Sequence, residues 1–352
     1  MSFLNEEETA SLTVRRMILH VVGGVGEFEA QKEMADLDHS AFFLDRIRGA
    51  AIDGVHSFEA ASDTKLRLER IARGDVSFEA GAQELSRSFS KAHVEASREG
   101  VFFVFELGVG LDDRVIYCLM KYDYRNVLEL TARDGRQSLR SSVQAFVTER
   151  RAIQKSCLVR VVGGKAEDLA SAFDRMGRAP DLTDYFGRFL EVRRSRSDVE
   201  LTTSLGDMLG ATLSSCREVL PGRDVVAALE ASKGSLLGRE VINENAVREA
   251  ILVGGGSPQA ERTRSELDDA TTKQLKRHGL SGVEFRPAPA VLAQRPRLQI
   301  KTVEGVVLSY PGEEEGKAVR RERDGSGWTI TIRTKRDMIQ DATLASKARG
   351  GA

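Results

Sequence analysis

The segment from Gly100 to Leu130 constrains the fold of this chain most, because it is the most aromatic and β-branched part of the sequence. Two such runs, 101–107 and 114–121, flank a glycine-containing loop with Asp112 and Asp113. This pattern is typical of a β-hairpin with a longer loop. The first run is apolar almost without a break, as in a strand covered on both faces. We therefore expect the centre of the main sheet here.

The remaining N-terminal elements fit around this hairpin. Residues 12–22 predict a strand that ends at Gly23-Gly24, and apolar spacing then predicts three helices, at about 37–51, 62–74 and 77–99. After the hairpin, residues 124–130, 143–147 and 158–162 predict further short strands, with a turn at Asp134-Gly135. Together these elements predict an N-terminal α/β sheet domain over residues 1–165.

The pattern becomes helical from Pro180. Helices are expected at about 181–190, 197–220, 225–236 and 241–252, and we assign residues 166–257 to a helical region. Gly254-Gly-Gly-Ser-Pro258 has the composition of a flexible linker. A helix at about 260–277 follows. Short strands are then expected at 283–287, 297–303, 306–310, 318–323 and 328–333, which gives a small β-rich region over 258–352. The fold class predicted is α+β, with a mixed central sheet.

Composition narrows the class of protein. A chain of 352 residues with 41% hydrophobic and 30% charged residues is typical of a globular protein with more than one domain. No apolar run reaches the length of about 18 residues that a membrane span needs, and the N-terminus is acidic where a signal peptide would be basic. Cys118, Cys157 and Cys216 are isolated, which fits neither a disulfide framework nor a zinc site. We expect a cytoplasmic protein without membrane contact.

The glycine-rich turns do not predict a nucleotide site. A dinucleotide fingerprint read from Gly24 has Glu29 where the third glycine belongs, and acidic side chains there would repel a pyrophosphate. The similar run that ends at Lys165 lacks the serine or threonine and the spaced glycine of a P-loop. We expect no cofactor, no metal and no catalytic residue. A metal-dependent nuclease built on Asp112, Asp113, Lys121 and Asp123 is the distant alternative.

The charge of the chain is divided unevenly along the sequence. The net charge is −1, yet the part from Lys273 onward has 16 basic and 9 acidic residues, which leaves −8 for the part before it. Such a division indicates a basic working surface at the C-terminal end, or uneven surface charge without a partner. Because Lys and Arg neutralise phosphates, the first interpretation predicts binding to the DNA backbone without sequence preference.

The candidate DNA-binding residues are the cations of this region: Arg286, Arg295, Arg297, Lys301, Lys317, Arg320, Arg321, Arg323, Arg333, Lys335 and Arg336. Along a strand, Arg321 and Arg323 would share a face. Aromatic residues for base stacking are scarce there, because Tyr310 and Trp328 are the main ones and Trp328 also suits a core. Double-stranded DNA is therefore the expected partner.

Several short stretches resemble the bacterial nucleoid-associated proteins of the NdpA type. They are a first strand with a His-Val-Val run, Ala-Phe-Phe at 41–43, the aromatic hairpin from Gly100 with its Leu-Met-Lys-Tyr at 119–122, Asp-Tyr-Phe-Gly-Arg-Phe-Leu at 184–190, and the ending Trp-Thr-Ile-Thr-Ile-Arg at 328–333. The resemblance implies a cytoplasmic, nucleoid-located DNA-binding protein that is dimeric and has no catalytic residues. Accessory components of anti-phage defence complexes have a similar outline.

A protein-interaction scaffold is the main alternative function. The near-neutral net charge and the heptad-like spacing of Leu201, Leu205, Met208 and Leu209 in the helix 197–220 favour it. That helix would form either a homo-oligomer interface or ordinary core.

Overall fold

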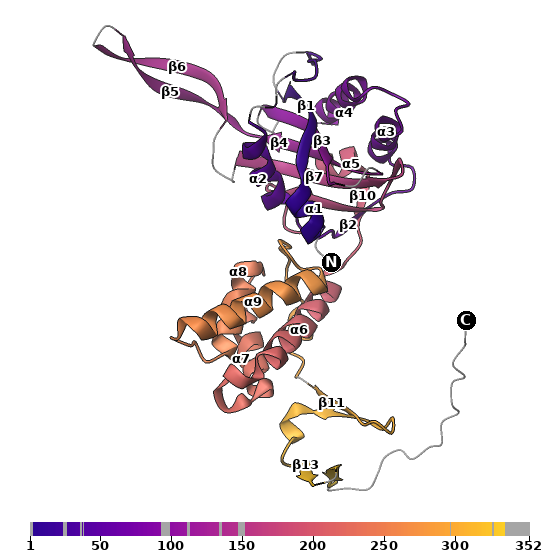
Figure 1. Ribbon diagram of the computed structural model, residues 1–352, viewed down its shortest axis with the longest axis vertical. Coiled ribbons are helices and arrows are strands. Elements are labelled where there is room, and N and C mark those ends of the chain that lie inside the picture. The colour runs from indigo at the N-terminus through magenta and orange to yellow at the C-terminus, as the bar shows by residue number, and fades with distance from the viewer. Residues whose placement is uncertain are drawn as a thin grey trace. The chain divides into compact units, whose positions relative to one another are not determined.

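The computed structural model describes residues 3–23, 27–35, 37, 39–92, 99–110, 113–133, 136–146, 152–295, 297–325 and 327–334. The chain divides into two compact units, Met1–Ala293 and Gln294–Ala352. The first unit holds a central sheet with helices on both faces and a group of further helices, and the second unit holds two small hairpins (Figure 1).

The central sheet has eight strands, and every described strand pair in it is antiparallel. Seven of them follow the order β1 (Thr13–Val22), β3 (Gly100–Gly108), β4 (Arg114–Tyr122), β7 (Ile153–Val162), β9 (Leu169–Asp174), β2 (His56–Phe58) and β10 (Val192–Arg194), and β8 (Lys165–Ala166) pairs with β7. The α+β class is thus confirmed, but the mixed sheet expected is an antiparallel one. Antiparallel pairing follows from the direct connections from β3 to β4 and from β7 through β8 to β9, which reverse the chain without a crossover helix.

The hairpin β3–β4 lies inside the sheet and is buried on both faces, as its sequence predicts. Phe102 and Val104 belong to the hydrophobic core on one face of the sheet, and Phe103 and Phe105 belong to the core on the other face. All four side chains have no exposed surface. Successive residues of a strand point to opposite faces, so an uninterrupted apolar run contributes to two cores at once.

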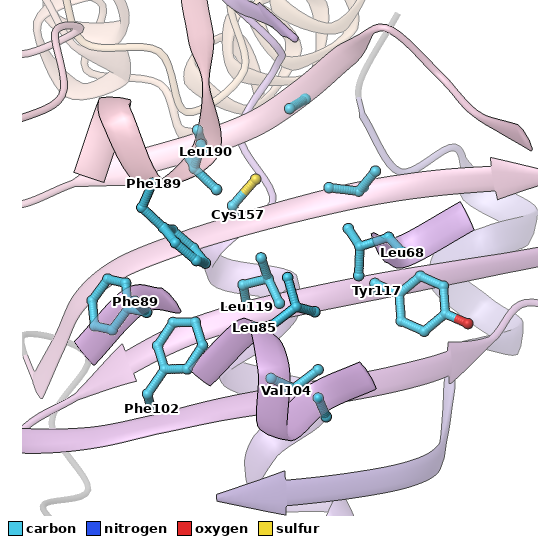
Figure 2. Packing of buried hydrophobic residues seen from close by; sticks show 14 of the residues in the cluster. Leu68, Leu85, Phe89, Phe102, Val104, Tyr117, Leu119, Cys157, Phe189 and Leu190 are labelled. Atoms are coloured by element: carbon cyan, nitrogen blue, oxygen red, sulfur yellow. The ribbon is translucent and has the colours of Figure 1, made fainter. Parts of the chain in front are cut away.

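Three helices cover the first face: α3 (Asp63–Ala72), α4 (Phe78–Ala92) and α5 (Asp184–Leu190). Figure 2 shows Phe89 of α4 beside Phe102 of β3, and their rings stack with centroids 4.2 Å apart. Phe189 of α5 packs edge-on against both rings. Helix α3 begins where the Ser62 side chain accepts a hydrogen bond from the Lys65 amide, which caps the helix.

Two helices cover the second face: α1 (Glu6–Ser11) and α2 (Ser40–Ala50). Phe43 and Ile47 of α2 pack on the sheet, with the Phe43 ring 5.1 Å from that of Phe103. Helix α1 is held by Glu8, whose carboxylate is fully buried and forms ion pairs with Arg114 of β4 at 2.9 Å and Arg160 of β7 at 2.7 Å. These ion pairs and their hydrogen bonds lower the pKa of Glu8 against the opposing effect of burial.

A second core lies among α6 (Asp198–Ser215), α7 (Val225–Leu236), α8 (Glu244–Gly254), α9 (Glu261–His278) and α10 (Pro289–Leu292), with short 3-10 turns at Arg217–Val219 and Pro221–Arg223. The heptad-like residues of α6, among them Leu201 and Leu205, are buried in this core. Its apolar face therefore packs inside the chain rather than forming an oligomer interface.

The glycine run at 254–256 is a close-packed turn between α8 and α9 and not the flexible linker expected. A Cβ at Gly254 would lie 2.6 Å from the Ala228 carbonyl oxygen, and one at Gly255 would lie 2.8 Å from Leu267. Both α8 and α9 contribute to the same helical core. The glycines are thus required by close approach of the helices, which a composition pattern alone cannot distinguish from a linker.

The remaining strands form three separate two-stranded sheets. They are β5 (Tyr124–Arg133) with β6 (Arg136–Phe146), β11 (Arg297–Lys301) with β12 (Val307–Pro311), and β13 (Val319–Asp324) with β14 (Gly327–Ile332). A 3-10 turn at Gly312–Glu314 follows β12. The segment 283–287, expected to be a strand, contributes only a single bridge between Phe285 and Ile242.

The expected domain boundaries shift accordingly. The sheet continues past residue 165 through β9 and β10 to Arg194, so the helical region begins at Asp198 rather than at 166. The compact C-terminal unit begins at Gln294 and not at 258, because α9 packs with α6 and α8 in the helical core. No helix in the described part of the chain has the length and apolar character needed to cross a membrane.

Replacing Glu8 tests the attachment of α1 to the sheet. We expect Glu8→Ala to lower the free energy of unfolding by about 3 kcal/mol, because Arg114 and Arg160 would keep their charges without the shared partner. The measurement is urea denaturation. Glu6→Ala is the matched control: the Glu6 side chain is 92% exposed and lies 3.6 Å from Lys276, so its loss should change stability by less than about 0.5 kcal/mol. Equal effects of the two substitutions would contradict this account.

The pH dependence of stability should report on His20. This side chain has no exposed surface, and neither ring nitrogen has a hydrogen-bond partner among the described residues. Burial and the nearby positive charge of Arg87 lower the pKa of His20 to about 4. The unfolded chain therefore binds the proton first, and stability should fall as pH drops from about 6.5 to about 4. Chemical denaturation at several pH values should show a shallower fall in His20→Leu; an unchanged slope would contradict the assignment.

Candidate nucleic-acid interface

Two hairpins of the C-terminal unit carry five of the eleven cations expected to bind DNA. In β11–β12, Arg297 pairs with Pro311 and Lys301 pairs with Val307. Alternation along β11 puts Arg297, Gln299 and Lys301 at positions on one face. Lys301 is exposed beside the turn that joins the strands.

The register of β13–β14 separates two chemically different faces. Arg323 lies opposite Trp328 and Arg321 lies opposite Ile330. Directly opposite residues of an antiparallel pair share a face, so both arginines share a face with Trp328 and Ile330. The prediction that Arg321 and Arg323 share a face is confirmed. Arg320 lies on the other face, which also carries Glu322 and Asp324.

Glu315 offsets one of these charges. Its carboxylate accepts a hydrogen bond from the hydroxyl of Tyr310 and forms an ion pair with the Arg321 guanidinium at 2.6 Å. Tyr310 is 5% exposed, and burial together with the Glu315 carboxylate raises its pKa. Arg321 is thus tied to Glu315, and a phosphate would have to compete for it.

The other candidate cations divide by location. Lys301, Lys317, Arg320, Arg323 and Arg333 are exposed and form no ion pair within the described residues. Arg295 is also exposed. Arg286 is exposed but belongs to the first unit, while Lys335 and Arg336 lie outside the described residues. The structure therefore groups five exposed, unpaired cations in one small unit.

Trp328 is available at the surface. Its side chain is 66% exposed, so it does not form the core that the sequence also allowed. An exposed indole on the face of Arg321 and Arg323 can stack on a base or pack against a sugar. The sequence alone could not show whether Trp328 is buried or exposed. Alternation along a strand tells which residues share a face, but it does not tell which face of a two-stranded hairpin is covered.

The unit as a whole is only mildly basic. Residues 294–334 contain eight basic and six acidic side chains. With such a balance of charges, binding of this unit to DNA would have moderate affinity, and that affinity would depend strongly on salt concentration. The acidic residues, Glu315 above all, were missed by the sequence reasoning. The sequence feature that indicates them is the run of three consecutive glutamates, Glu313, Glu314 and Glu315, shortly before the basic strand β13.

Asp113 and Asp123, the described acidic residues of the alternative nuclease interpretation, belong to no group of side chains that could hold a metal ion. Lys121 is fully buried, and burial beside Lys155 lowers its pKa to about 8. Asp123 accepts a hydrogen bond from the amide of Gln154. Asp112 lies outside the described residues. Among the residues that the structure describes, no group of three or more His, Cys, Asp and Glu side chains could hold a metal ion.

Comparison with known proteins adds no family: no family model matches the sequence, and no curated protein gives a significant match. The likeness to nucleoid-associated proteins of the NdpA type therefore stays a prediction from the sequence.

Removing the negative charge of Glu315 should strengthen any contact of this surface with phosphates. We expect Glu315→Gln to tighten binding to duplex DNA several-fold at low salt, because Arg321 loses its competing carboxylate. The logarithmic salt dependence of affinity should steepen by about one unit. Fluorescence anisotropy with a labelled duplex measures both quantities. Glu304→Gln removes the same charge at an exposed turn that has no ion pair among the described residues, and a comparable gain there would argue against a specific role of Glu315.

Proposed function

We propose that this protein is a non-catalytic, nucleoid-associated DNA-binding protein that contacts the phosphate backbone without sequence preference. The observation that carries the proposal is a group of exposed cations in the C-terminal unit that form no ion pair within the described residues: Lys301, Lys317, Arg320, Arg323 and Arg333. Cations that are not held by carboxylates can release the counterions of DNA on binding, which is the main source of non-specific affinity.

The shape of the hairpins agrees with backbone contacts. Short two-stranded sheets present cations on both faces, and no helix of this unit is described that could enter the major groove. The proposal includes a cytoplasmic location at the nucleoid and a bacterial source, both of which come from the resemblance. It requires no cofactor.

The scaffold alternative has lost its main support. It depended on the heptad-like residues of α6, which pack in the helical core of the same chain. A role as accessory component of an anti-phage defence complex is compatible with the DNA-binding proposal, since such a component would contact DNA through the same surface. A dimer likewise remains part of the proposal through the resemblance.

Charge reversal on the strand β13 tests the proposal. We expect Arg320→Glu, Arg321→Glu and Arg323→Glu together to weaken binding to a mixed-sequence duplex at least about 100-fold at low salt, because three cations become repulsive. Fluorescence anisotropy measures the affinity. Arg70→Glu, Arg193→Glu and Arg262→Glu together form the control, since they change the net charge equally at exposed positions of the first unit. Equal losses in both triple variants, or no loss in the first, would overturn the surface assignment.

A further inference from the structure

A groove lies at one edge of the central sheet, in the first unit of the chain. Strand β2 and β10, the last strand in the order of the sheet, supply one side of it, and α5 with residues 181–183 supplies the other. The groove has a volume of about 860 Å³, and ligand-binding sites of proteins have volumes of this order. It is therefore large enough to hold a small molecule or a side chain of a partner.

Helix α5 uses only one of its sides for the hydrophobic core. Phe186, Phe189 and Leu190 are buried there, and Figure 2 shows Phe189 and Leu190 among the core side chains. Gly187 instead lines the groove, and a Cβ added to it would meet no neighbouring atom of the described residues within 4 Å. The absence of a side chain at this position therefore leaves the groove open.

The imidazole of His56 lines this groove and lacks a hydrogen-bond donor. The side chain is 4% exposed, and its Nδ1 has no partner among the described residues. Burial lowers the pKa of His56 to about 4, an effect that Asp181 opposes and Arg194 adds to, so the ring is neutral at pH 7. A neutral imidazole has one nitrogen that accepts a hydrogen bond. Because buried polar groups rarely lack a partner, a donor bound in the groove would complete this site.

The charges around His56 favour a cation. Six charged residues line the groove, four acidic and two basic: Glu59, Asp181, Asp184, Glu191, Arg188 and Arg194. Arg194 is already engaged, because its guanidinium forms ion pairs with Asp198 at 2.5 Å and with Asp181 at 3.4 Å. Glu59 and Asp184 are exposed and form no ion pair within the described residues. Their carboxylates are thus available to a positively charged ligand.

The composition of the groove favours an organic cation over a metal ion. In the part of the chain that the structure describes, no group of three or more His, Cys, Asp and Glu side chains could hold a metal ion. Leu182 and Val192 add apolar surface to the groove. Such surface suits the methylene groups of an aliphatic amine, and an ammonium group has three N–H donors for the carboxylates and the imidazole.

We propose that this groove binds an alkylammonium cation, whether from a free polyamine or from a lysine side chain of a peptide. The ammonium group donates hydrogen bonds to the imidazole of His56 and to the carboxylates of Glu59 and Asp184. The aliphatic chain lies along Leu182 and Val192. The site uses residues of the first unit and repels phosphates, so this inference does not rest on the proposed DNA binding.

Filling the groove without changing its charge is the first test. We expect Gly187→Leu to weaken binding of spermidine to the full-length chain at least about 10-fold, because the new side chain takes the place of the ligand. Isothermal titration calorimetry at low salt measures the affinity. Gly234→Leu in α7 is the matched control, since a Cβ there also meets no neighbouring atom of the described residues within 4 Å and the position lies outside the groove. Leucine favours helix over glycine, so both variants should stay folded.

Neutralising the two available carboxylates is the second test. We expect Glu59→Gln and Asp184→Asn together to weaken spermidine binding about 5- to 10-fold, because two exposed ion pairs with the ligand are lost. Glu230→Gln and Glu240→Gln together remove the same charge at exposed positions outside the groove and should leave the affinity unchanged. Equal losses in both double variants would show that only the net charge of the chain attracts the amine, which would overturn the site.

A second probe separates the two sources of the ammonium group. The probe is a blocked pentapeptide with one lysine between alanines. Tighter binding of spermidine assigns the groove to free polyamines, and tighter binding of the peptide assigns it to a lysine side chain of a protein. Absence of binding of both probes to the wild-type chain at low salt, or equal affinity of the wild type and Gly187→Leu, would overturn the proposal.

The contact with the imidazole has a spectroscopic readout of its own. The chain has five histidines, so the ring signals of a sample labelled with nitrogen-15 at histidine can be followed by NMR. Addition of spermidine should shift the ring signals of one histidine in the wild type and of none in Gly187→Leu. Unshifted histidine signals in the wild type at saturating spermidine would contradict the role of His56.

Discussion

Burial of β3, β4 and β7 on both faces is the constraint on which the first unit depends. Each of these strands supplies side chains to two hydrophobic cores, so helices from the N-terminal segment and from residues 63–92 must cover opposite faces. Burying apolar surface stabilises a protein by about 25 cal/mol per Å². A strand that is apolar on both faces therefore requires a layer of helices on each side.

Because the central strands are buried, the charged surface to which we assign DNA binding lies outside the central sheet, in the C-terminal unit. Two buried charges next to the sheet are paired: Glu8 of α1 with Arg160 of β7, and Lys155 of β7 with Asp174 of β9. Pairing is needed there because an isolated buried charge is costly. The exposed cations to which we assign DNA binding lie outside these cores, in the C-terminal unit that holds β11 to β14. In the proposed function, DNA binding and folding stability would use different residues of the same sequence.

The sequence predicts which helices and strands form this fold better than it predicts where domains and connections begin and end. The uninterrupted apolar run of β3 is a local feature of the sequence, so the burial of this strand on both faces is predicted correctly. The turn at Gly254 was misread because a glycine required by close helix contact has the same composition as one in a linker. The pairing of Arg321 with Glu315 depends on the turn before β13, which brings Glu315 beside this strand, and the run of glutamates was only a weak signal for it. That Arg321 and Arg323 share a face could be predicted, because it follows from strand geometry alone.

The most direct test of the account is the salt dependence of wild-type binding to several duplexes of unrelated sequence, measured by fluorescence anisotropy. The account predicts affinities that agree within a few-fold among the duplexes. It also predicts a logarithmic slope against salt concentration of about −4 or steeper, because several phosphates are neutralised at once. Absence of binding at low salt, or affinity that depends on sequence but hardly on salt, would contradict the central claim that this protein binds DNA through its phosphate backbone.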